Sequence, residues 1–183
     1  MAVTRRAALK QLLYVSAGMA ILPACLQHTS RTSLTLKNIS VDGDQEKMLA
    51  ELVETIIPAT TTPGAKELSA HLFTLIMMDD CYKKEDQQKW LSGMKAFEQA
   101  SRKLNGHTFL ESTPAQRESL LSAFEAAKDD KDDAAFFYRA TKRLTIEAYT
   151  SSKYFLTKVD IYELVPARYH GCVPLKPITR KLA

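Results

Sequence analysis

Apolar residues recur three and four positions apart over five stretches between residues 42 and 149. This spacing places them on one face of an α-helix. The stretches predict helices over residues 43–57, 67–80, 85–104, from residue 114 onward, and over 134–149. We therefore expect an all-α fold: a small irregular bundle of about five helices with an extended C-terminal tail.

Several helix ends carry local sequence signals. Asp42 with Gln45 three positions later forms a capping box, and Pro58 ends the first helix. Asn105-Gly106 is typical of a C-terminal glycine cap. Thr113-Pro114-Ala115-Gln116 places a cap residue, a proline at the first helical position and a glutamine in order.

The predicted core follows from the same periodicity. One side chain in three or four of each helix is expected to face inward. The inward positions are Met48, Leu49, Leu52, Val53, Ile56, Ile57, Leu68, Leu72, Leu75, Ile76, Met78, Trp90, Leu91, Met94, Phe97, Ser101, Leu104, Leu120, Leu121, Phe124, Phe137, Ala140, Leu144 and Ala148.

Two segments lack a helical period and are candidate contact surfaces. The loop 58–65 contains Pro58, Pro63 and Gly64, which favour a rigid turn. Beyond residue 151 the pattern predicts an extended tail that contains Pro166. The tail is rich in aromatic residues, which often anchor protein contacts; they either form an interface or pack over the helices. These aromatic residues are Tyr154, Phe155, Tyr162 and Tyr169.

The first 24 residues have the pattern of an export signal peptide. The basic part contains Arg5, Arg6 and Lys10, and the apolar run over residues 12–22 is shorter than the roughly 20 residues of a membrane-spanning helix. Residues 4–10 resemble the twin-arginine motif, whose export route carries folded proteins. Arg5-Arg6 as an ordinary basic region of the general secretory route is the alternative.

Cys25 is a candidate lipidation site. Leu22-Pro23-Ala24-Cys25 resembles a lipobox, although proline at its second position departs from the usual pattern. Lipid chains on Cys25 would anchor the protein to a membrane; the alternative is an ordinary cysteine. The predicted organisation is a twin-arginine signal peptide over 1–24, an anchor cysteine with a polar tether over 25–38, and a helical domain over 39–183.

Composition limits the class of partner. Removal of residues 1–24 leaves 159 residues with 22 Lys and Arg against 21 Asp and Glu, a net charge of +1. No basic stripe remains that would indicate nucleic-acid binding. Cys81 and Cys172 are the remaining cysteines, in a compartment that permits disulfides; they either form a bridge or are two buried free thiols.

Catalytic and cofactor motifs are missing from the sequence. It contains no G-x-G-x-x-G, P-loop, C-x-x-C, H-E-x-x-H or G-x-S-x-G pattern. His71 fits a partly buried helix position better than a ligand position. His170 and Cys172 are two neighbouring metal-ligand types, which is too few to close a site. We therefore expect no catalytic, cofactor or metal site in this chain.

The residues also resemble a known family. Five parts of the sequence are similar to gluconate 2-dehydrogenase subunit 3. They are the leader, Glu54-Thr-Ile-Ile-Pro-Ala-Thr60, Thr62-Pro-Gly-Ala65, Phe109-Leu110 with Thr113-Pro-Ala-Gln-Arg117, and Val165-Pro-Ala-Arg-Tyr-His-Gly-Cys-Val-Pro174. The resemblance implies an accessory subunit of a membrane-associated sugar or sugar-acid dehydrogenase. It implies that a flavoprotein partner of the glucose–methanol–choline oxidoreductase type holds FAD and passes electrons to a cytochrome c or another acceptor.

The resemblance further implies that the small subunit exports its folded partner to the periplasm or cell envelope. Two alternatives remain open at the level of sequence. The chain could be a free-standing helical envelope lipoprotein that binds a ligand or envelope component. It could also be an enzyme that uses Asp79, Asp80 or His170 as a base.

Overall fold

The computed structural model describes residues 32–126, 132–160, 162, 163 and 172. Arg5, Arg6, Cys25, Pro166 and Tyr169, which the sequence singled out, lie outside these residues, as does His170. The helices are α2 (Gly43–Ile56), α3 (Ala70–Cys81), α4 (Lys84–Asn105), α5 (Pro114–Ala126), α6 (Asp133–Thr150) and the π-helix η1 (Phe155–Val159). The described residues contain no strand, and the predicted all-α fold is confirmed.

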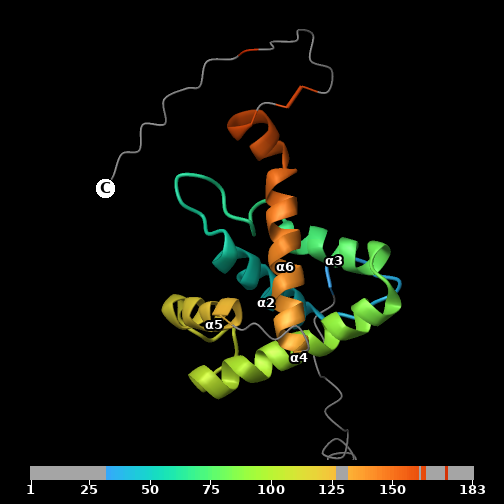
Figure 1. Cartoon of the computed structure of the whole chain (residues 1–183), viewed down its shortest axis with the longest axis vertical. Coiled ribbons are helices and arrows are strands. Elements are labelled where there is room, and N and C mark those ends of the chain that lie inside the picture. Colours follow the sequence, from blue (N-terminus) through green and yellow to red (C-terminus); the bar gives the residue numbers. More distant parts are fainter. Residues whose placement is uncertain (1–31, 127–131, 161, 164–171, 173–183) are drawn as a thin grey trace, which may run out of the picture.

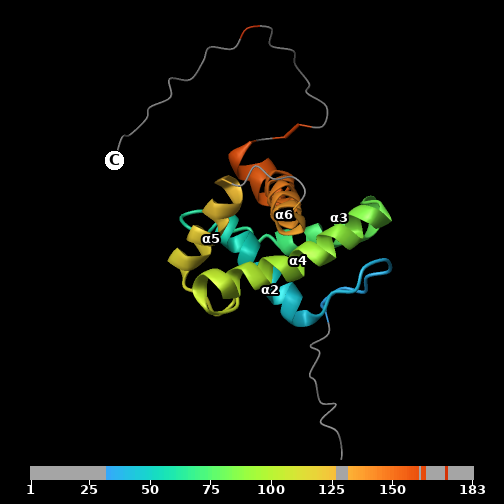
Figure 2. The ribbon, with the colours of Figure 1, turned by 60° about the horizontal axis from the view of Figure 1, so that its bottom comes forward.

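Helix α6 is the centre of the bundle, and α3 and α4 make the most extensive contacts with it. Figure 1 shows α6 upright in the middle of the molecule, with α4 across its lower end and η1 at its upper end. Figure 2 shows α4 crossing in front of the bundle, with α5 on the opposite side from α3. The molecule is thus organised along α6, whose two ends meet different segments.

An aromatic cluster fills the junction of α4 and α6. The Phe97 and Phe137 rings lie 5.4 Å apart between centroids, and Phe137 also lies 5.2 Å from Trp90. The Trp90 indole N–H, buried with the ring, donates to the Thr141 hydroxyl over 3.2 Å. Gly93 permits the close approach, since a Cβ there would lie 2.1 Å from the Asp133 carbonyl oxygen. The two longest helices therefore pack backbone to backbone at this crossing.

The local helix signals are confirmed. The Asp42 carboxylate accepts from the Gln45 backbone N–H at 2.8 Å, and the Gln45 side chain accepts from the Asp42 N–H at 3.0 Å. Gly106 ends α4 in the left-handed conformation, with φ of 78°. Thr113 and Gln116 pair reciprocally at the start of α5. Each signal depends on residues within three positions, so the sequence alone determines it.

Three details of the predicted helices are wrong. Helix α3 begins at Ala70, three residues later than predicted, because Ser69 adopts a left-handed conformation with φ of 58° that breaks the helix. Ile76 and Leu104 were expected inside but are 44% and 55% exposed. Ile76 continues the apolar run of α3 on its outer face, and Leu104 lies on the last turn of α4, where no neighbouring helix covers it.

Residues 32–41 form an arm that packs on the helical domain. We predicted residues up to 38 as part of a polar tether, whereas the structure docks Leu34 and Leu36 against the core and buries Ile39 and Val41. The reason is a buried partner distant in sequence. The Asp79 carboxylate accepts three backbone N–H groups of the arm, those of Lys37 (2.8 Å), Asn38 (2.6 Å) and Ile39 (2.9 Å).

Glu46 and Gln87 complete the attachment of the arm. Glu46, buried on α2, accepts from the Ser33 backbone N–H at 2.6 Å and from the Ser33 hydroxyl at 2.5 Å. The Gln87 amide of α4 donates to the backbone carbonyls of Met78 and Asp79, each at 2.9 Å. The Asn38 side chain also donates to the Asp79 carbonyl, at 2.8 Å.

The chain after α6 is more compact than predicted. We expected an extended tail from residue 151, but residues 155–159 form a π-helix that packs against the end of α6. Ser152 starts this turn, because its hydroxyl accepts from the Phe155 N–H over 3.2 Å. None of the described helices is long and apolar enough to cross a bilayer.

Candidate partner-binding surface

The loop 58–65 is held in one conformation by a carboxylate from α2. Glu54 accepts the backbone N–H of Ala59 at 2.9 Å and that of Lys66 at 3.0 Å, on the two sides of the loop. The Ala65 N–H closes the loop by donating to the Ile57 carbonyl at 2.9 Å. Gly64 leaves room for this carboxylate, because a Cβ there would lie 2.4 Å from the Glu54 oxygens. These hydrogen bonds fix the loop at both of its ends, and the rigidity that its prolines predict stays a prediction.

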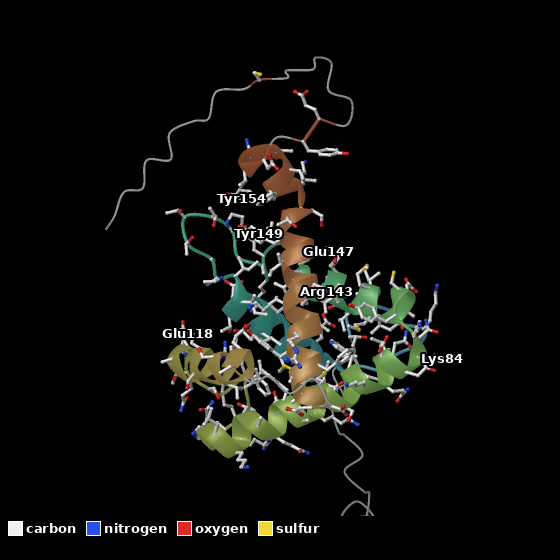
Figure 3. All side chains as sticks on the ribbon, in the orientation of Figure 1. Lys84, Glu118, Arg143, Glu147, Tyr149 and Tyr154 are labelled. Carbon is white, nitrogen blue, oxygen red and sulfur yellow. The ribbon has the colours of Figure 1, made fainter. Side chains whose placement is uncertain are left out.

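The loop meets the C-terminal end of α6. The Tyr149 hydroxyl donates to the Pro63 carbonyl over 3.1 Å, and the Tyr149 ring lies edge-on to Phe155 with centroids 6.2 Å apart. Beneath them Val53, Ala65, Ala70 and Ala148 form a small buried cluster. Tyr149 thus joins two segments that are about 90 residues apart in the chain. Figure 3 shows Tyr149 and Tyr154 at this upper end of α6, near the loop.

We call residues 58–65, 149, 154–160 and 162 the loop–η1 surface. Pro58 and Tyr162 are exposed on it, Pro63 is half-buried and Gly64 is buried beneath the loop. Tyr162 is 62% exposed although its backbone N–H is fixed to the Leu156 carbonyl at 3.0 Å. Val159 is 55% exposed beside it. The four described residues that the sequence proposed as contacts lie on or under one surface; their role in binding a partner stays a prediction.

A charge network fixes the loop to the rest of the domain. The Glu51 carboxylate pairs with Lys66 at 2.5 Å and with Arg117 at 2.7 Å. Arg117 also donates to the carbonyls of Phe109 and Leu110, at 3.0 and 2.9 Å. The hydrogen bond from Lys66, with that from Arg117, lowers the pKa of Glu51 against the opposing effect of burial. Glu51 therefore links α2 both to Lys66, directly after the loop, and to the connector before α5.

The side chains that the sequence offered as catalytic bases lie in surroundings typical of structural residues. Asp79 is 4% exposed; burial opposes its ionisation, but the N–H groups of Lys37, Asn38 and Ile39 outweigh burial and lower its pKa. A carboxylate held ionised by three donors is a poor proton acceptor. Asp80 next to it is exposed. Burial lowers the pKa of His71, whose buried Nδ1 has no hydrogen-bond partner among the residues that the structure describes.

Two open depressions lie away from the loop–η1 surface. A groove of about 920 Å³ runs between the arm and α4, beside Leu36, Leu91 and Lys95. A smaller one of about 350 Å³ lies beside Glu98 and Arg102, where burial raises the pKa of Glu98. Within the described ranges no three His, Cys, Asp or Glu side chains cluster as metal ligands would. Cys81 and Cys172 are free and exposed rather than buried.

The sequence analysis missed the structural role of three residues: Asp79, which attaches the arm, and Glu54 and Tyr149, which hold the loop 58–65. Asp79 lies four positions after Leu75 on the buried stripe of α3, and an acidic residue at such a position indicates a buried acceptor. Glu54 and Tyr149 carry no comparable signal, since their partners lie in a loop whose path the sequence does not determine.

The fold and this surface define a class: a small all-α domain with a partly aromatic, exposed surface at one end. Comparison with protein families is more specific. The model of the gluconate 2-dehydrogenase subunit 3 family matches residues 43–167, and the chain belongs to that family. No curated protein and no solved structure matches it significantly. The matched range begins at the first residue of α2 and contains all the residues of the loop–η1 surface.

Proposed function

We propose that this chain is the non-catalytic small subunit of an FAD-dependent sugar dehydrogenase complex that oxidises gluconate, glucose or a glucoside. Its role is to escort the folded flavoprotein through twin-arginine export, and then to stabilise and anchor it in the cell envelope. Family membership supports the accessory-subunit role. The observation that carries the proposal is the loop–η1 surface, whose loop is fixed by hydrogen bonds and which exposes large apolar side chains.

The surface has the physical properties of a binding site for a protein. Its backbone is fixed by Glu54, Tyr149 and the η1 hydrogen bonds, so little conformational entropy is lost on association. Tyr162 and Val159 present apolar area that a partner would bury. A durable complex of this kind buries about 2,000 Å² or more in total, so the surface forms part of the interface.

Export and anchoring are assigned to the N-terminal residues. Arg5 and Arg6 direct the complex to the twin-arginine route, which suits a partner whose FAD is inserted before export. Lipid on Cys25 then holds the complex at the membrane, where a cytochrome c or another acceptor receives the electrons.

Replacing Arg5 and Arg6 together by lysine tests the export role. We expect flavoprotein activity in the envelope fraction to fall to the level of cells that lack the small subunit, with the flavoprotein retained in the cytoplasm. The measurement is dehydrogenase activity with an artificial electron acceptor in separated fractions. Lys10→Arg keeps a cation in the same leader and is the control. Full activity in the envelope of the double variant would overturn the escort role.

Truncating the exposed side chains of the loop–η1 surface tests the contact. Val159→Ala with Tyr162→Ala is expected to weaken binding of the purified flavoprotein by about tenfold or more, because large apolar anchors dominate interface energies. The measurement is titration by calorimetry. Ile76→Ala, on an exposed site of α3, is the matched control and should bind normally. Equal affinity for the double variant and the control would exclude this surface as the contact.

A free-standing ligand-binding lipoprotein is the second candidate, because the groove of about 920 Å³ beside the arm could admit a ligand. It predicts a chain that is stable and monomeric alone. The subunit role predicts a chain that gains stability and solubility from the flavoprotein.

A further inference from the structure

The arm is a fixed part of the domain. Its backbone is bound by Asp79 through three N–H groups and by Glu46 at Ser33, and its apolar side chains are packed or buried. Hydrogen bonds to an ionised carboxylate are stronger than neutral ones, which makes this attachment durable. Any constraint on the chain at residue 32 is therefore transmitted to the whole domain.

The arm and the loop–η1 surface lie toward opposite ends of the molecule. Arm residues and α4 residues Leu91 and Lys95 line one groove, while Gly93 between them receives the start of α6 at Asp133. Helix α6 then runs for 18 residues, about 27 Å, before η1 begins. Figures 1 and 2 both place η1 at the end of α6 away from α4.

Cys25 is close to the arm along the chain. Six residues lie between Cys25 and Thr32, the first residue of the arm. The seven steps from Cys25 to Thr32 span at most about 25 Å when the chain is fully extended, which is no more than the length of α6. With a lipid on Cys25, the average distance from the bilayer to the arm is therefore shorter than the average distance from the bilayer to the far end of α6.

We propose that the arm orients the domain on the membrane, with the arm side of α4 facing the bilayer and the loop–η1 surface facing away from it. This inference rests on the proposed function, since it takes Cys25 as the lipid anchor. It explains how one small subunit serves two partners at once: the lipid surface is met at one end and the flavoprotein at the other.

Surface charge adds only a weak contribution to this orientation. Lysines on the arm side attract anionic headgroups, and acidic side chains next to them offset about half of that attraction. The exposed lysines are Lys37, Lys83, Lys84 and Lys95, and the exposed acidic neighbours are Asp80 and Glu85. The covalent anchor and the attached arm therefore remain the main determinants of which side faces the lipid.

Förster resonance energy transfer from a dye on the protein to a labelled lipid in the membrane tests the proposal. The full-length lipidated chain is placed in phosphatidylcholine vesicles that contain an acceptor-labelled lipid. One variant, Cys172→Ser, carries a donor dye on Cys81, which is exposed at the end of α3 close to the Asp79 attachment. The second combines Cys81→Ser, Cys172→Ser and Lys158→Cys, and carries the same dye on η1. We expect markedly stronger transfer from position 81 than from position 158.

A flexible insertion provides the matched comparison. Twelve Gly and Ser residues placed between residues 31 and 32 leave the arm contacts intact but lengthen the connection, and should reduce the difference between the two dyes. In the chain without the insertion, equal energy transfer from positions 81 and 158, or stronger transfer from position 158, would overturn the proposed orientation but not the lipid anchor. Mass spectrometry of the Cys25 peptide tests the lipid anchor itself. A Cys25 without acyl groups would overturn both the anchor and the orientation, while flavoprotein binding would be unaffected.

Discussion

Replacing Gly93 by alanine is expected to lower the free energy of unfolding by about 3 kcal/mol, because the added Cβ overpacks the α4–α6 crossing. That Cβ would lie 2.1 Å from the Asp133 carbonyl oxygen and 2.7 Å from the Phe137 Cβ. Both contacts involve atoms that cannot rotate away, so α4 and α6 must separate. Urea denaturation followed by circular dichroism measures the loss.

Ser92→Ala is the matched control for this variant. Ser92 is the preceding residue of the same helix and is exposed, so alanine there should leave stability unchanged or raise it slightly through helix propensity. If Gly93→Ala unfolds at the same urea concentration as Ser92→Ala, the backbone contact between α4 and α6 is not as close as described.

Asp79→Ala is expected to destabilise the protein by about 3 kcal/mol, because it removes three charge-assisted hydrogen bonds and leaves buried arm N–H groups unpaired. Limited proteolysis should then cut the arm over residues 32–41 before the helices. Asp80→Ala, one residue further on an exposed position, is the control and should be nearly neutral. An arm that remains resistant to protease in Asp79→Ala would contradict the attachment.

The effect of Asp79 depends on pH in a defined direction. Burial opposes ionisation, but the three arm N–H groups hold the pKa of Asp79 below its ordinary value of about 4. The ionised side chain therefore stabilises the folded state fully above that ordinary value, and its contribution is lost as the pH falls through the lowered pKa. The difference in unfolding free energy between the native chain and Asp79→Ala should be largest at neutral pH and narrow in acid.

Features that depend on neighbours in sequence were predictable. The capping box of Asp42 and Gln45, the glycine cap at Gly106 and the start of α5 at Pro114 each involve a few consecutive residues. The buried residues of α5 and α6 also followed from the spacing of their apolar positions. The spacing of apolar residues determines such features before any tertiary contact forms.

Features that depend on distant partners were not predictable. The arm contains many Ser and Thr residues and looks like a tether, but its backbone finds an acceptor at Asp79, about 40 residues away. Helix α3 starts late because Ser69 takes a left-handed conformation, a few residues after the point where Glu54 binds the Lys66 N–H, and η1 follows from packing against the end of α6. The candidate surface was foreseen as two separate segments, and only the contact between Tyr149 and Pro63 joins them.

Gln87 gives the N-terminal half of the domain its cooperativity. The final carbonyl groups of a helix have no partner within the helix and ordinarily fray in water. In α3 the carbonyls of Met78 and Asp79 are instead bound by the amide of Gln87 from α4, and the Asp79 carbonyl also by that of Asn38 from the arm. The last turn of α3 cannot open unless the arm and the first turns of α4 move with it. A mechanical pull on the N-terminal side of the chain is therefore shared by two helices of the core.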